Sequence, residues 1–377
     1  MNETKDSDAS VFSMPSMRAV DVVDGLLSHA AKLGASDIHI DPRMLDVLVR
    51  LRVDGEMEFA GSIPLQTHEE LIARLKILSG ARTDLHSVPQ DGRFRSDIAG
   101  SPYNIRVSFM PTFHGENAVI RLLPSRFDGQ DTFAALGFSP DHVELIQSAL
   151  AKPNGLILVT GPTGCGKTTT LRVCLGLKAM QPIAVMTLED PVEYEVPGVR
   201  HVHIRESYGV TFAAGLRSAL RQDPDVIMLG EIRDNETAKT AVQTALTGHL
   251  VLSTLHTTSA ADTFVRLANM GVERYLMAAT LRIVISQRLV RMVCQECGGL
   301  GLDCKACRES GFRGRAVIAE VIVVDDKLRL LIERGLDHID LAEHLKSSGF
   351  RSMNEDAAEK VDWGVTTGSE VLKALHS

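Results

Sequence analysis

The stretch from Gly161 to Thr168 constrains this chain more than any other, because it matches the pattern G-x-x-x-x-G-K-[ST] of a phosphate-binding loop. A short run of branched apolar residues, 155–160, precedes it and predicts a buried strand of a parallel sheet. The residues that follow, 168–180, predict a helix. Strand, glycine loop and helix in this order favour a nucleotide site over a glycine-rich turn that holds a lysine by chance.

Each residue type in the loop has a chemical reason. Glycines let consecutive backbone N–H groups point at phosphate oxygens, and the N-terminus of the next helix adds a partial positive charge. We expect Lys167 to reach the β- and γ-phosphates of ATP and Thr168 to ligate Mg²⁺. The predicted nucleotide-binding residues are Gly161, Pro162, Thr163, Gly164, Cys165, Gly166, Lys167, Thr168 and Thr169.

Length and composition indicate the class of protein. The 377 residues predict two or three domains, and a hydrophobic content of 44% is enough for proper cores. The net charge of −8 provides no global basic field that would draw the chain to nucleic acid. No apolar run approaches the ~20 residues of a membrane span, and the first residues lack the order of a signal peptide. We therefore expect a cytoplasmic protein whose residues 1–17 form a disordered tail.

Residues 18–123 predict a first α/β domain. A helical pattern begins near Val20 and stops at Gly34, and Asp54-Gly55 is a hairpin signal after a strand over 45–53. Further strands are predicted over 37–40, 93–98, 103–110 and 117–123, with a second helix over 68–78. Residues 124–135 are typical of a linker.

Residues 136–377 predict the second domain. Ser139 is expected to cap a helix that leads into the phosphate-loop strand. Strands predicted over 183–188, 226–229 and 250–254 alternate with helices predicted over 212–221, 236–246 and 260–270. This order is typical of a parallel sheet covered on both faces, where ligands bind beyond the carboxyl ends of the strands. An apolar run over 316–324 and the helical patterns after it are expected to be packing elements.

Polar residues follow three of these strands. Glu231 follows one of them and is a candidate for the Mg²⁺ shell or for orienting the attacking water. Glu189 belongs to a second acidic cluster, and His256 ends a third strand that begins near His249. A single acidic residue or histidine is more often a surface charge or a structural group. Three such placements after a phosphate loop favour a catalytic role for Glu231, Glu189 and His256, whereas His249 is expected to be structural.

Several motifs occur in a fixed order along the chain: 161–168, 189–194, 220–225, 230–234 and 247–256, and in the first domain 36–39, 90–94, 106–108 and 121–123. With them the chain, from roughly Val20 to its end, resembles the secretion ATPases of type II secretion and type IV pilus systems. In that family the motifs of the second domain include the Walker A, Asp box, Walker B and His box.

The resemblance implies a small N-terminal α/β domain followed by a RecA-like P-loop ATPase domain with C-terminal helices. It also implies a homohexameric ring, peripheral at the cytoplasmic face of the inner membrane. There, ATP hydrolysis would drive a polytopic platform protein that adds or removes pilin subunits, and a small docking protein is a further expected partner. Arg106 and Arg121 would reach the γ-phosphate when the two domains close. The predicted catalytic set is therefore Glu231, Glu189, His256, Arg106 and Arg121.

The spacing of the cysteines distinguishes assembly and secretion members of this family from retraction members. Cys294-x-x-Cys297 and Cys304-x-x-Cys307 have the spacing of a four-thiolate zinc site, and a cytoplasmic location argues against disulfides. Assembly and secretion members carry such an element, whereas retraction members typically lack it. Three features are expected to depart from the family pattern: only six residues separate Cys297 from Cys304, Cys165 replaces the usual serine, and the extra docking domain of larger members is expected to be missing before the first domain.

The leading hypothesis is a motor ATPase for pilin assembly or secretion, and the near alternative is a retraction motor of the same family. A nucleic-acid translocase is a different class, against which stand the net charge of −8 and the lack of a DNA-binding module. A regulator that binds ATP without turnover would need no carboxylate beside the γ-phosphate, so Glu231 and Glu189 argue against it.

Overall fold

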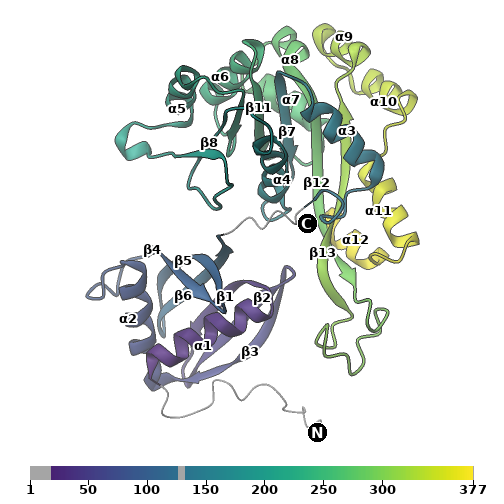
Figure 1. Cartoon of the computed structure of the whole chain (residues 1–377). Helices are drawn as coiled ribbons and strands as arrows, with labels where there is room; N and C mark the ends of the chain where they lie inside the picture. The colour runs from purple at the N-terminus through teal and green to yellow at the C-terminus, as the bar shows by residue number, and fades with distance from the viewer. Residues whose placement is uncertain (1–17, 126–131, 377) are drawn as a thin grey trace. The chain divides into compact units, whose positions relative to one another are not determined.

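The computed structural model describes residues 18–125 and 132–376, and the chain divides into two compact units between residues 126 and 127 (Figure 1). The expected tail, 1–17, and the centre of the expected linker, 126–131, lie outside the described residues. Among the helices of the described ranges, none has the length and apolar character needed to cross a membrane.

Unit 1 is an antiparallel sheet with two helices packed on it. Its strand order is β3-β2-β1-β6-β5-β4. Alternate residues of the second strand, Val47, Val49 and Leu51, are buried in the same core as both helices, as period-2 spacing requires. The elements are α1 (Ala19–Lys32), β1 (Ala35–Pro42), β2 (Asp46–Val53), β3 (Glu56–Pro64), α2 (His68–Ser79), β4 (Gln90–Ile98), β5 (Ser101–Thr112) and β6 (Gly115–Pro124).

Unit 2 is built on a seven-stranded sheet with the order β13-β12-β7-β11-β10-β8-β9. All neighbours are parallel except β12 and β13. The strands are β7 (Gly155–Thr160), β8 (Val185–Glu189), β9 (Val199–His203), β10 (Val226–Leu229), β11 (Leu250–Leu255), β12 (Leu281–Val293) and β13 (Phe312–Val323). The helices are α3 (Pro140–Leu150), α4 (Lys167–Ala179), α5 (Phe212–Ala219), α6 (Asn235–Leu246), α7 (Asp262–Asn269), α8 (Arg274–Thr280), α9 (Asp326–Arg334), α10 (His338–Ser347), α11 (Met353–Asp362) and α12 (Gly368–His376).

Helices cover both faces of this sheet (Figure 1). Leu156 and Leu158 of β7 pack into one core with α5, α6, α7 and α8, whereas Ile157 and Val159 pack into another with α3 and α4. Successive side chains of a strand point to opposite faces, so a strand buried on both sides is apolar throughout. The predicted α/β fold class with a doubly covered parallel sheet is therefore confirmed.

Several elements differ from the sequence-based expectation. Strands β3, β9 and β12 and helices α8 and α11 were not predicted, because charged or small residues interrupt their apolar periodicity. The end of the expected linker is packed: Phe133 is buried and its ring meets Phe138 edge-on. Ser139 occupies the N-cap position of α3 without a capping hydrogen bond. Its hydroxyl accepts a hydrogen bond from Arg351 instead.

Candidate functional site

The phosphate-loop residues lie between the carboxyl end of β7 and the first turn of α4. Gly164 and Gly166 have φ values of 80° and 89°, in the left-handed region that favours glycine. A Cβ atom on Gly161 would come within 2.5 Å of the carbonyl oxygen of Gln287 on the neighbouring strand β12. The glycines are therefore needed both for the turn and for close packing against β12.

Lys167 folds back over this loop. Its Nζ donates hydrogen bonds of 2.8 Å to the carbonyl oxygens of Gly161 and Pro162. Burial lowers the pKa of Lys167, while the neighbouring Cys165 and Glu231 act in the opposite direction. The ammonium group is thus held against the loop by two carbonyl oxygens and interacts electrostatically with Glu231.

Glu231 and His256 meet beyond the carboxyl ends of β10 and β11. Glu231 Oε1 accepts a hydrogen bond of 2.5 Å from Arg233, and Glu231 Oε2 lies 3.7 Å from His256 Nε2. The two strand ends are tied together, because Thr254 Oγ1 donates to the carbonyl oxygen of Gly230 at 2.7 Å. Side chains that are 25 residues apart in the sequence therefore form one cluster at the edge of the sheet where ligands are expected.

The charge state of His256 follows from its surroundings. Burial is the largest cause that lowers its pKa, and the positive charge of Lys167 adds to it, while Glu231 raises it. The lowered pKa favours the neutral imidazole, which offers one donor and one acceptor.

Glu189 is held at the end of β8, on the side facing β9. Its Oε1 accepts hydrogen bonds from Thr187 Oγ1 at 2.6 Å and from His201 Nδ1 at 2.9 Å. Only 7% of the residue is exposed. The sequence did not reveal His201, because β9 was not recognised as a strand. One carboxylate oxygen of Glu189 thus has a fixed orientation.

The arginines of unit 1 form a row across its sheet. Arg106 is directly opposite Arg121 in the β5–β6 pairing and opposite Arg93 in the β4–β5 pairing. Arg121 Nε also donates to Asp37 Oδ1 at 2.8 Å, across the β1–β6 pairing. Like charges directly opposite one another destabilise a sheet. The Asp37 carboxylate offsets part of this repulsion at the Arg121 end of the row.

The four cysteines converge between β12 and β13. Their sulfur atoms all lie within 4.8 Å of one another, with 3.9 Å from Cys294 to Cys304 and 3.7 Å from Cys297 to Cys307. Zn–S bonds of ~2.3 Å in a tetrahedron place sulfur atoms ~3.8 Å apart, so the donor set fits Zn²⁺. The Gly301 N–H donates to Cys297 and lowers the pKa of that thiol to about 7, whereas the side-chain hydrogen bond with Cys307 raises the pKa of Cys304 to about 11. We call these residues the tetracysteine cluster.

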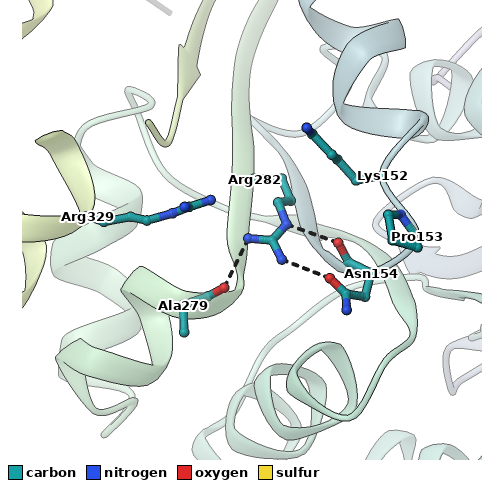
Figure 2. Close-up of a pocket in the computed structure, with 6 residues that line it drawn as sticks. All are labelled: Lys152, Pro153, Asn154, Ala279, Arg282 and Arg329. Carbon is teal, nitrogen blue, oxygen red and sulfur yellow. Dashed lines mark hydrogen bonds between the residues drawn. The ribbon is translucent and has the colours of Figure 1, made fainter. Parts of the chain in front are cut away.

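A surface hollow of about 430 Å³ lies at the opposite edge of the sheet, next to the start of β7 (Figure 2). Figure 2 shows the guanidinium of Arg282 bonded to both oxygens of Asn154 and to the carbonyl oxygen of Ala279. These bonds tie β12 to the turn before β7 and to the end of α8. We assign the hollow a structural role, separate from the phosphate loop.

Sequence reasoning missed two residues next to the loop, Gln287 and Arg288 of β12. The Gln287 side chain contacts the loop and the start of α4, and Arg288 donates to the carbonyl oxygen of Thr258 at 2.8 Å. Both are at least nine-tenths buried. A polar Gln-Arg pair within the apolar run 283–290 was the available signal.

Comparisons with known proteins agree with this arrangement. The family model described as "Type II/IV secretion system protein" matches residues 16–373. The chain is 42% identical to the type II secretion system protein HxcR of Pseudomonas aeruginosa, over 94% of this chain and 77% of that protein. It is also 42% identical to the type IV pilus assembly ATPase PilB of Thermus thermophilus, over 90% of this chain and 41% of that protein. The crystal structure of the pilus retraction motor PilT with bound ADP superposes with a TM-score of 0.66, at 26% identity, over 93% of this chain and 96% of that one.

Proposed function

The chain belongs to the type II/IV secretion system protein family, and we infer that it is an ATPase that powers pilin or pseudopilin assembly in a type II secretion or type IV pilus system. The observation that carries this inference is the phosphate loop with Lys167 folded over it, beside the cluster of Glu231 and His256. A loop that only binds a nucleotide has no need of a carboxylate and a neutral imidazole at this edge.

The tetracysteine cluster favours assembly or secretion over retraction. Both relatives that share 42% identity are named for secretion or pilus assembly, and the sulfur spacing supports a zinc site. The retraction motor PilT is similar in fold at 26% identity, so a retraction ATPase is the alternative. We therefore propose that the chain binds one Zn²⁺ through Cys294, Cys297, Cys304 and Cys307.

The residues of the site have different proposed roles. Lys167 and the N-terminus of α4 bind the phosphates of the ground state, and Thr168 would help to hold a Mg²⁺ ion, which supplies charge neutralisation when bound. Glu231 orients the attacking water, and its hydrogen bond with Arg233 fixes the carboxylate. His256, whose lowered pKa favours the neutral imidazole, faces the γ-phosphate from the end of β11. Glu189 is a second catalytic carboxylate at the end of β8, oriented by its hydrogen bond with His201.

We propose that the active form is a homohexamer and that Arg106 and Arg121 complete the site. The transition state spreads negative charge over three equatorial oxygens, and a guanidinium matches that charge better than an ammonium. The row of opposed arginines supports this role, since an anion would relieve its repulsion. The proposed location is the cytoplasmic face of the inner membrane, with a polytopic platform protein as the partner and a small docking protein as a second candidate.

The nucleotide site can be tested with Lys167→Ala. We expect this variant to lose ATP binding in a fluorescence titration while its thermal unfolding stays close to that of the wild type, because the Lys167 ammonium bonds only to residues of the loop itself. Lys239→Ala on α6 is the matched control, which should bind ATP normally. Full binding by Lys167→Ala would contradict the assigned site.

The assembly and the partner need a second experiment. Specific ATPase activity of the wild type should rise with protein concentration until the ring saturates. Adding the platform protein that co-purifies from membranes should raise it further, whereas DNA should not. A monomer that hydrolyses ATP at full rate would contradict the ring, and stimulation by DNA would favour a translocase.

A further inference from the structure

Gln287 is a fully buried polar side chain in contact with the phosphate loop. It lies on β12 one residue beyond Ser286, which is paired with Thr160 at the carboxyl end of β7. The exposed fraction of Gln287 is 0%, and that of Thr170, on the first turns of α4, is also 0%. A fully buried amide needs a partner for each of its polar ends, or burial costs free energy.

Both ends of this amide are bonded to the nucleotide site. Gln287 Nε2 donates to the carbonyl oxygen of Cys165 at 2.7 Å, and Gln287 Oε1 accepts from Thr170 Oγ1 at 2.8 Å. A Cβ atom on Gly166 would come within 3.1 Å of Gln287 Nε2. The glycine at this position therefore admits the Gln287 side chain as well as forming the turn.

The hydrogen bond to Cys165 determines the direction of a whole peptide unit. In a trans peptide the C=O and the next N–H point in opposite directions. With the Cys165 carbonyl directed at β12, the N–H of Gly166 must point away from β12. Backbone N–H groups of such a loop bind phosphate oxygens, so a rotated peptide would present a carbonyl oxygen to an anion.

We propose that Gln287 is a positioning residue for ATP binding: its amide holds the Cys165–Gly166 peptide so that the N–H of Gly166 faces the phosphates. It contacts the loop backbone, and the proposed role needs no contact with the nucleotide. The Cys165 carbonyl can only accept, so it fixes which end of the amide faces the loop, and the Thr170 hydroxyl satisfies the buried Oε1. This inference rests on the proposed nucleotide site and adds a residue that acts on it from another strand.

The test separates loop positioning from simple core packing. Gln287→Met keeps the shape and removes both bonds, so we expect the Kd for a fluorescent ATP analogue to rise about tenfold or more. Thr170→Val removes only the bond to Oε1 and keeps the donor to Cys165. It should lower the free energy of unfolding but change this Kd by less than about threefold. Gln147→Met, an exposed position on α3, is the matched control and should change neither quantity.

A second variant keeps the test decisive if Gln287→Met does not fold. Gln287→Asn keeps a neutral amide but is one methylene shorter, so it loses the bond from the amide N–H to the Cys165 carbonyl and should also weaken ATP binding. Wild-type affinity in both Gln287 variants would overturn the inference, and so would equal losses of affinity in Thr170→Val and Gln287→Met. If the wild type itself bound no ATP, the proposed function would fail instead, so the two failures are distinguishable.

Discussion

Glu231→Gln isolates the contribution of one carboxylate to ATP hydrolysis. The substitution keeps the shape of the side chain and removes its negative charge. Glu231 is one-fifth exposed, accepts a 2.5 Å hydrogen bond from Arg233 and lies 3.7 Å from His256. In the proposed site, Lys167 and the loop backbone bind the ground-state phosphates. We therefore expect the variant to keep its ATP affinity within a few-fold.

The expected loss lies in turnover. A preorganised group that acts only in the transition state contributes about 10²–10³ in kcat, which is about 2.7–4 kcal/mol. We expect a loss of this size when phosphate release is measured under saturating ATP. A second readout comes from His256: Glu231 raises its pKa, so in Glu231→Gln the pKa of this imidazole should fall further, which NMR titration can follow.

A neighbouring carboxylate, Glu236, provides the control for this experiment. Glu236→Gln removes a nearby carboxylate that is 64% exposed and pairs with Arg217 on the surface, so its turnover should match the wild type. Normal turnover in Glu231→Gln would refute the role assigned to Glu231. A parallel loss of affinity and turnover would instead indicate that the carboxylate acts on ground-state binding.

Three further predictions concern other parts of the molecule. Arg106→Ala or Arg121→Ala should keep ATP affinity within a few-fold while turnover falls by about 10³-fold or more, and two variants with wild-type turnover would exclude them as arginine fingers. Purified protein should contain about one Zn²⁺ per chain by elemental analysis, and Cys297→Ser should lose it without unfolding the sheet, whereas metal-free protein after zinc-replete expression would reject the site. Burial lowers the pKa of His142 from 6.5 to about 4, so its contribution of about 3 kcal/mol is present above pH 6.5 and lost as the pH falls towards 4. Urea unfolding of the wild type and His142→Gln should show a difference in stability that narrows over this range.

Local patterns in the sequence determined the main helices and strands of this protein, their buried faces and the positions of its motifs. Three features could be predicted because each lies within a short stretch of sequence. They are the order of strand, glycine loop and helix, the apolar runs of β7, β10 and β11, and the spacing of the cysteines. Such patterns report which faces of an element are buried, because periods of 2 and 3.6 residues are properties of the backbone itself. They also predicted that Glu231 and His256 follow strands of the same sheet.

Contacts between distant segments were decided only by the tertiary structure. Gln287 and Cys165 are 122 residues apart, and they meet because β12 is inserted beside β7 in the sheet order. The arginine row depends on the register of three strands, and a shift by one residue would move its side chains to the other face. Strand order and register follow from how the whole core packs, so no local window of the sequence contains them.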